Sequence, residues 1–114
     1  MGLTINQYQE GALRTMKPID DRGSQLLNGV MGLNGEAGEC IDILKKCMFQ
    51  GHDLDSEKLI EELGDVAWYL AISADALDIK LEDLLQMNLD KLYKRYPEGF
   101  DAERSIHREE NQEG

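Results

Sequence analysis

One acidic pattern occurs twice in this chain, and both copies have the spacing of an α-helix. Residues 33–40 and 59–66 each read leucine, two variable residues, glutamate, an apolar residue, glycine, an acid and an apolar residue. A helix turns by about 100° per residue, so the two acids of each copy lie on one helical face. The pattern therefore predicts two amphipathic helices, each with an acidic pair beside an apolar stripe: Glu36 with Glu39, and Glu62 with Asp65.

The remaining sequence also predicts helices, because no segment has the alternation of a strand and both prolines lie outside the periodic segments. We expect helices at about residues 4–16, 24–50, 55–77 and 81–95, the first opened by a capping box of Thr4 and Gln7. Short connections favour an all-α fold, an antiparallel four-helix bundle. We expect one domain at 1–102 and a polar C-terminal tail at 103–114. Five apolar residues off the main stripes indicate a second buried face that an oligomer would cover: Ile41, Met48, Trp68, Ala71 and Ile72.

Bulk properties limit the kinds of partner. The chain has 114 residues and a net charge of −11, so a nucleic-acid backbone is an unfavourable partner. No apolar run approaches the roughly 20 residues that span a membrane, and the first residues lack a signal-peptide pattern. Cys40 and Cys47 lie two helical turns apart, about 10 Å at 1.5 Å per residue, too far for a disulfide. We expect free thiols and a reducing cytoplasm.

The two acidic pairs predict a metal site if their helices pack together. Four carboxylates at the edge of a core repel one another unless a hard cation lies among them. Oxygen ligands suit Mg²⁺, with Mn²⁺ as a substitute, and disfavour zinc. A ferritin-like di-iron site needs Glu-x-x-His pairs, and neither His52 nor His107 follows a glutamate by three residues. The alternative is that both pairs are solvated faces of amphipathic helices.

The acidic motifs resemble the signature of the MazG family, E-E-x-x-E followed by E-x-x-D. Here they read E-A-G-E at residues 36–39 and E-L-G-D at residues 62–65. The resemblance covers most of the chain, from Tyr8 and Gln9 to the stretch at residues 94–100. Gly35 stands where the signature has its first glutamate. That position is not one of the family's ligands, so the resemblance still implies metal binding but not any outer-shell help from that carboxylate.

The family comprises all-α nucleoside triphosphate pyrophosphohydrolases, related in fold to dimeric dUTPases and to phosphoribosyl-ATP pyrophosphohydrolase. The resemblance implies Mg²⁺-dependent hydrolysis between the α- and β-phosphates, which gives a nucleoside monophosphate and pyrophosphate. It also implies a housecleaning role, a homodimer or homotetramer, and Mg²⁺ ligation by the four acids of the two pairs. A carboxylate that is not fully committed to metal can take a proton from the attacking water. Glu39 is the first candidate for this base and Glu61 the second.

Lys46 and Tyr69 are candidates for substrate contacts on the two acidic helices. Lys46 projects near the acidic edge of its helix, where its ammonium would meet a phosphate; a solvated lysine is the alternative. Tyr69 follows Asp65 by one turn on the same edge, where it could stack on a base or hydrogen-bond a phosphate. The alternative for Tyr69 is a boundary tyrosine with its hydroxyl in water.

The last predicted helix carries a second group of candidates. Asn88 falls in the middle of its apolar stripe, and a buried amide needs hydrogen-bond partners. Lys91 and Arg95 flank Asn88. The family resemblance makes Asn88 a nucleotide contact and the two cations phosphate contacts. A structural asparagine that is satisfied by backbone groups is the alternative.

Two other functions are consistent with the sequence. A non-catalytic helical interaction module would keep the fold, although it has no reason to carry four mutually repelling carboxylates. The same chemistry on a specialised substrate such as phosphoribosyl-ATP is the second. Base and sugar preference depend on pocket side chains that the sequence does not place.

Overall fold

The computed structural model describes residues 2–106, apart from the side chain of residue 104. The all-α prediction is confirmed for this part of the chain, and the four predicted helices lie close to their expected bounds. A fifth, short helix at the end was not expected. Across the described residues, no helix is long and apolar enough to cross a membrane. The helices are α1 (Ile5–Leu13), α2 (Arg22–Phe49), α3 (Ser56–Ala76), α4 (Leu81–Arg95) and α5 (Ala102–Ile106).

Local side-chain contacts explain where the helices begin and end. The predicted capping box is present, because the Gln7 N–H donates to Thr4 Oγ1 at 3.1 Å and the Thr4 N–H donates to Gln7 Oε1 at 2.9 Å. α2 begins slightly earlier than predicted because the Asp21 carboxylate accepts from the Ser24 N–H at 2.7 Å. Just after α2, Gly51 adopts φ +74°, a left-handed conformation that ends helices and favours glycine.

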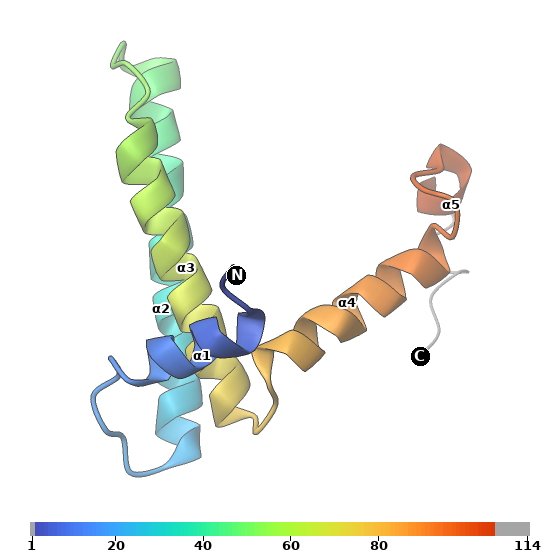
Figure 1. The fold of residues 1–114 in the computed structure, drawn as a ribbon. Helices are drawn as coiled ribbons and strands as arrows, with labels where there is room; N and C mark the ends of the chain where they lie inside the picture. The colour runs from blue at the N-terminus through green and yellow to red at the C-terminus, as the bar shows by residue number, and fades with distance from the viewer. Residues whose placement is uncertain (1, 107–114) are drawn as a thin grey trace. The chain divides into compact units, whose positions relative to one another are not determined.

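The chain forms two compact units, Met1–Leu81 and Glu82–Gly114. In the first, α2 and α3 run antiparallel side by side and α1 packs across α3 (Figure 1). This antiparallel pair supplies two helices of the predicted bundle. The second unit holds most of α4 and all of α5, and the rings of Tyr96 and Phe100 pack there with centroids 5.6 Å apart. Residues 107–114 of the predicted tail lie outside the described residues, whereas 102–106 form α5.

The core of the first unit lies in the C-terminal half of α3. Ala71, Ile72 and Ala74 are fully buried there, and Ala12 of α1 is buried as well. Ala71 and Ile72 were expected to need an oligomer for burial, and this expectation is wrong because α1 covers this part of α3 within one chain. Small side chains dominate the core, so the three helices approach closely.

Two glycines of α2 allow the close approach of α3. A Cβ atom at Gly29 would lie 3.2 Å from the backbone nitrogen of Ser73 and would also meet its hydroxyl. A Cβ atom at Gly32 would overlap the ring of Tyr69. Glycine costs about 1 kcal/mol against alanine inside a helix. At these two positions the close packing of α3 explains why glycine is present despite that cost.

Two buried glutamines fix α1 and α2 to the same half of α3. The Gln9 amide donates to the Ala71 carbonyl at 3.2 Å, and its oxygen accepts from the Leu81 N–H at 2.8 Å. The Gln25 amide donates to the Ile72 carbonyl at 3.1 Å. Buried amides stabilise a fold only when they are hydrogen-bonded, so these contacts set the position of α1 and α2 along α3.

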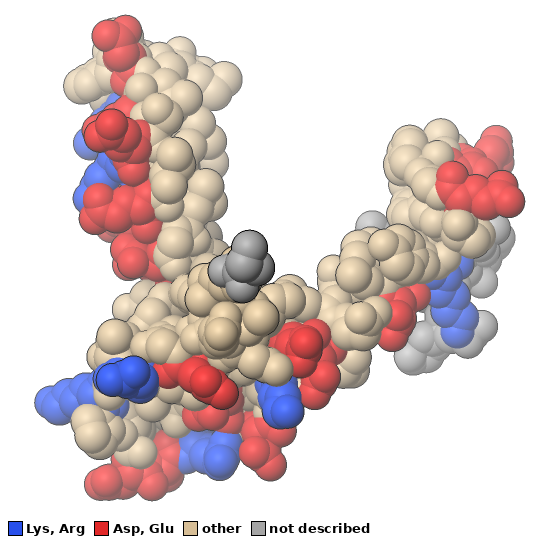
Figure 2. Space-filling model, viewed as in Figure 1, with Lys and Arg blue, Asp and Glu red and all other residues tan. Residues whose placement is uncertain are grey.

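The surface of the α2–α3 hairpin divides into an acidic edge and an apolar face. Acidic side chains gather along one edge of its loop end, with lysines beside them, and uncharged side chains cover the adjoining surface (Figure 2). Many large apolar side chains of this hairpin are exposed in the single chain. They include Leu27, Val30, Met31, Ile41, Met48, Phe49, Ile60 and Leu63.

Candidate metal centre

Three carboxylates from the repeated motif converge between α2 and α3. Glu36 of α2 and Glu62 and Asp65 of α3 each offer one oxygen, and these oxygens all lie within 4.8 Å of one another. Glu62 is buried, Glu36 is half-buried and Asp65 is exposed. The antiparallel pairing of the helices thus joins the two motif copies, and exposed Asp65 leaves the group open to solvent on one side.

The pKa values of two of these acids move in opposite directions. A hydrogen bond with Glu62, burial, and the charges of Glu62, Asp65 and Glu39 together raise the pKa of Glu36 to about 7. The pKa of Glu62 is lowered, first by the hydrogen bond with Glu36 and then by one with Lys58. Opposite shifts in adjacent carboxyl groups mean that the pair shares one proton between two acids.

These residues fit a hard divalent cation. Oε2 of Glu36 is buried, and no N–H or hydroxyl group of the described residues is its partner. A buried oxygen without a donor is unfavourable unless another group satisfies it. All three converging ligands are carboxylates, the donor type that Mg²⁺ and Mn²⁺ prefer. Glu36, Glu62 and Asp65 would hold such an ion.

Glu39, the fourth predicted ligand, lies outside the group of three converging oxygens and is exposed. It is nevertheless near, because its charge contributes to the raised pKa values of Glu36 and Cys40. Glu61, the second candidate base, is also exposed, and its charge helps to raise the pKa of Lys58. Both candidate bases therefore lie beside the converging acids.

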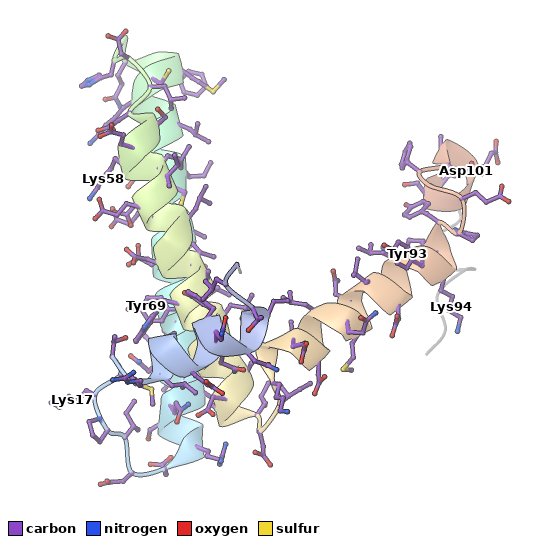
Figure 3. The ribbon with its side chains drawn as sticks, in the orientation of Figure 1. Lys17, Lys58, Tyr69, Tyr93, Lys94 and Asp101 are labelled. Carbon is purple, nitrogen blue, oxygen red and sulfur yellow. The ribbon has the colours of Figure 1, made fainter. Side chains whose placement is uncertain are left out.

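The two substrate candidates on α2 and α3 differ in their surroundings. Lys46 lies exposed in the last turn of α2. Tyr69 is half-buried, and its ring is held against the backbone of α2 at Gly32 and edge-on against Trp68, with centroids 5.0 Å apart (Figure 3). Trp68, which was expected at an oligomer face, is half-buried and donates its indole N–H to Thr15 Oγ1 at 2.8 Å.

The candidates on α4 belong to the second unit. Arg95 is buried, whereas Lys91 and Asn88 are exposed. The inward-facing Asn88 that the apolar stripe predicted is not observed in the single chain. Neighbouring Leu89 is exposed as well, whereas Leu85 and Leu92 are half-buried.

Two residues near the acids were not among the predicted site residues. Lys58 forms an ion pair with Glu62, Nζ to Oε1 3.1 Å, and its spacing four residues before a motif acid is the signal that could have identified it. Tyr8 of α1 has a raised pKa, first from burial and then from the charge of Asp65. No local pattern could have placed Tyr8, because its position depends on the packing of α1 across α3.

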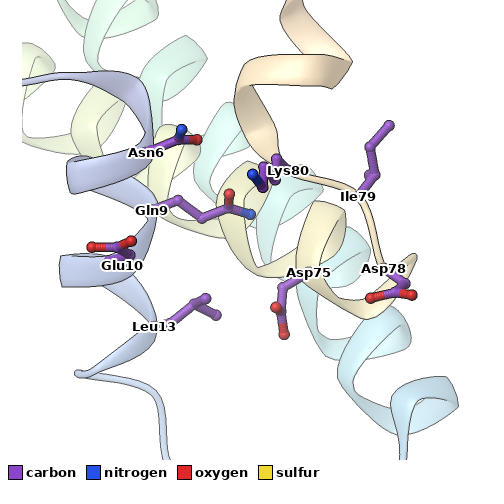
Figure 4. Close-up of a pocket in the computed structure, with 8 residues that line it drawn as sticks. All are labelled: Asn6, Gln9, Glu10, Leu13, Asp75, Asp78, Ile79 and Lys80. Carbon is purple, nitrogen blue, oxygen red and sulfur yellow. The ribbon is translucent and has the colours of Figure 1, made fainter.

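A separate pocket lies between α1 and the turn after α3 (Figure 4). Its volume is about 340 Å³. Two of its polar side chains already have protein partners: both ends of the Gln9 amide are hydrogen-bonded, and Asp75 accepts from Gln25 at 2.8 Å. It is therefore a weaker candidate than the converging acids. The lining residues are Asn6, Gln9, Glu10, Leu13, Asp75, Asp78, Ile79 and Lys80.

Comparisons with known proteins agree with this geometry. The MazG nucleotide pyrophosphohydrolase domain matches residues 26–100, which include both acidic motifs. The chain is 41% identical over 73 residues to "Gene 37 protein" of Mycobacterium phage L5, covering 60% of this chain and 64% of the phage protein. It is 45% identical over 40 residues to "Uncharacterized protein YvdC" of Bacillus subtilis (strain 168), covering 35% of this chain and 38% of that protein.

The chain thus spans less than two thirds of the length of either relative. No solved structure matches it. The domain match nevertheless covers well over half of the chain and contains all three converging carboxylates. The resemblance inferred from the two acidic motifs is thereby confirmed, and the chain belongs to the MazG nucleotide pyrophosphohydrolase domain family.

Proposed function

We propose that this protein hydrolyses nucleoside triphosphates, ribo- or deoxyribonucleotides, between the α- and β-phosphates in a Mg²⁺-dependent reaction. The products are a nucleoside monophosphate and pyrophosphate. The observation that carries the proposal is the convergence of Glu36, Glu62 and Asp65 with a buried, unpartnered oxygen on Glu36. Membership of a nucleotide pyrophosphohydrolase family supports the same reaction. Removal of surplus or aberrant nucleotides in the cytoplasm is the role that we propose for it.

We assign metal binding and proton transfer to acidic residues of the site. When bound, Mg²⁺ would offset the charge of the phosphate oxygens and lower the pKa of an attacking water. Glu36, Glu62 and Asp65 would hold the ion, and we propose Glu39 as a fourth ligand that is not fully committed to it. Glu39 lies beside them but outside the converging oxygens, so it is available to accept the proton of the water. Glu61 is the second candidate for this base.

Fixed positive charge and an aromatic ring would orient the substrate. We propose that Lys46, Lys91 and Arg95 contact phosphate oxygens, since lysine and arginine both bind phosphate. Tyr69 would contact the base or a phosphate, and its ring is already fixed by contact with α2. A residue that is held rigidly before binding loses less entropy when the substrate arrives. Asn88 would contact the nucleoside.

The test is turnover of a panel of nucleoside triphosphates and their deoxy forms with Mg²⁺. We expect Glu62→Gln and Asp65→Asn to abolish pyrophosphate release, because each removes a charged ligand from the converging group. Asp42→Asn, an exposed acid elsewhere on α2, is the matched control and should keep parental turnover. The proposal fails if the parent turns over no substrate of the panel, or if the motif variants are as active as the control.

We further propose that the protein works as a homo-oligomer, either a dimer or a tetramer, with a second copy on the exposed apolar face of α2 and α3. Met48 and Phe49 are 70% and 78% exposed in the single chain, and Ile60 is 68% exposed. Exposed large apolar side chains that gather into one patch mark protein–protein contact sites. A second hairpin on this face would form a bundle of four helices with α2 and α3, two from each chain, which differs from the single-chain bundle that the sequence predicted. Sedimentation equilibrium should give a dimer or tetramer, and a monomeric mass at assay concentration would contradict the proposal.

A further inference from the structure

Lys58 contacts the acidic centre directly. Its Nζ lies 3.1 Å from Oε1 of Glu62, and the Glu62 side chain is only 10% exposed. Lys58 itself is 49% exposed and extends from the loop end of α3 (Figure 3). An ammonium group therefore already contacts a carboxylate that belongs to the converging group.

Helix stability does not explain this ion pair. Lys58 lies in the first turn of α3, where the helix dipole disfavours a cation. A lysine that precedes its glutamate by four residues is also the weaker orientation of such a pair in isolated helices. Two local helix preferences therefore disfavour a lysine at position 58. We attribute the ion pair instead to the acidic side chains around Lys58.

Those acids come from both helices of the hairpin. The pKa of Lys58 is raised first by the hydrogen bond with Glu62, then by the charge of Glu61, and also by the charge of Glu39 on α2. Without a cation, the converging carboxylates repel one another across the α2–α3 contact. The Lys58 ammonium supplies positive charge beside Glu62, one of these carboxylates.

We propose that Lys58 is a positioning residue that acts as the counter-ion of the acidic centre before a metal ion binds. When a divalent cation binds Glu62, the ion pair between Lys58 and Glu62 breaks. The proposal rests on the proposed function, because it assumes a metal centre at Glu36, Glu62 and Asp65. The ammonium and the metal ion compete for the same carboxylate. Lys58 therefore holds the carboxylates in place before metal binds and weakens the apparent affinity for the ion.

The test is calorimetric titration of Mg²⁺, and of Mn²⁺ as a second probe, into the metal-free protein without nucleotide. Lys58→Met and Lys58→Gln remove the charge, and each should bind the ions about two- to fivefold more tightly, the effect expected for a partly exposed ion pair. Lys58→Arg keeps a cation and should stay close to the parental affinity. Lys45→Met removes an exposed charge elsewhere on α2 and is the matched control, with parental affinity expected.

A second readout comes from thermal unfolding of the same proteins. Both neutral variants should unfold at lower temperature than the parent in EDTA and gain more from added Mg²⁺. If the parent binds the ions but neither neutral variant binds them more tightly than Lys45→Met, the role of Lys58 is wrong and the proposed hydrolysis still stands. If the parent binds no divalent cation, the metal centre and the role of Lys58 are both wrong.

Discussion

Glu36 of α2 and Glu62 of α3 join the two copies of the acidic pattern across the α2–α3 contact, where each offers a carboxyl oxygen within 4.8 Å of the other. A hydrogen bond with Glu62 is the largest cause of the raised pKa of Glu36, about 7 against an ordinary value of 4.5. The repulsion between adjacent carboxylates that raises this pKa is the same repulsion that a divalent cation would relieve.

The raised pKa of Glu36 predicts how stability changes with pH in EDTA. The folded chain holds this proton more tightly than the unfolded chain. The contribution of this proton to the free energy of unfolding is therefore fully present below the ordinary pKa of Glu36, and it is lost as the pH rises through about 7. Glu36→Gln cannot ionise, and its amide can still donate to Glu62. We expect the variant to be more stable than the parent at about pH 8 and to lose this advantage at about pH 5. Urea unfolding at both pH values measures the difference, and an equal gain at both would contradict it.

Mg²⁺ should stabilise the folded chain, because a ligand that binds only the folded state raises the free energy of unfolding. The transition temperature of the parent should rise with Mg²⁺ concentration, and EDTA should reverse the rise. Asp65→Asn should respond weakly or not at all, whereas Asp42→Asn should respond as the parent does. Differential scanning fluorimetry is sufficient for this comparison. The same response in both variants would show that the ion binds elsewhere.

Two glycines of α2 should respond to alanine in opposite directions. At Gly29 a Cβ atom meets both the backbone and the hydroxyl of Ser73, so Gly29→Ala should destabilise the fold by about 1–3 kcal/mol through overpacking. At Gly35 no atom lies within 4 Å of the new Cβ, so Gly35→Ala should stabilise α2 by about 0.5–1 kcal/mol. Urea unfolding of the pair measures both changes. Stabilisation by Gly29→Ala would disprove the close approach of α2 and α3.

Gln9 is expected to contribute to stability through both ends of its amide. Gln9→Ala leaves the buried Ala71 carbonyl and the Leu81 N–H without this partner, which should cost about 1–3 kcal/mol of unfolding free energy. Gln86→Ala is the control, because Gln86 is exposed and donates to Asp90 on its own helix. Chemical unfolding of both variants measures the difference. A loss no larger than that of Gln86→Ala would show that α1 is not fixed by this contact.

The features that sequence predicted well are local. The capping box of Thr4 and Gln7 and the end of α2 near Gly51 depend on neighbouring residues, and both are observed. The grouping of Glu36 with Glu62 and Asp65 follows from helical periodicity and one assumption, that the two helices pair. Periodicity gives the face of a residue but not its distance from the partner helix, so it does not show that Glu39 lies further from Glu62 and Asp65 than Glu36 does.

The features that sequence did not predict depend on contacts between distant residues. The burial of Ala71 and Ile72 requires α1 to pack across α3, and no pattern within α3 indicates this. The packing of Gly29 against Ser73 and of Gly32 against Tyr69 is likewise set by the tertiary contact of α2 with α3. The amphipathic pattern of α4 predicted a buried Asn88, but Asn88 is exposed. An apolar stripe identifies one face of a helix and does not show which other element covers that face.

The position of phosphate cleavage tests the central claim most directly. Phosphorus NMR of a nucleoside triphosphate with Mg²⁺ and the parent protein should show a nucleoside monophosphate and pyrophosphate forming in equal amounts, with no such products from Asp65→Asn. A nucleoside diphosphate with orthophosphate, or an unchanged triphosphate for every base and sugar tested, would contradict the account.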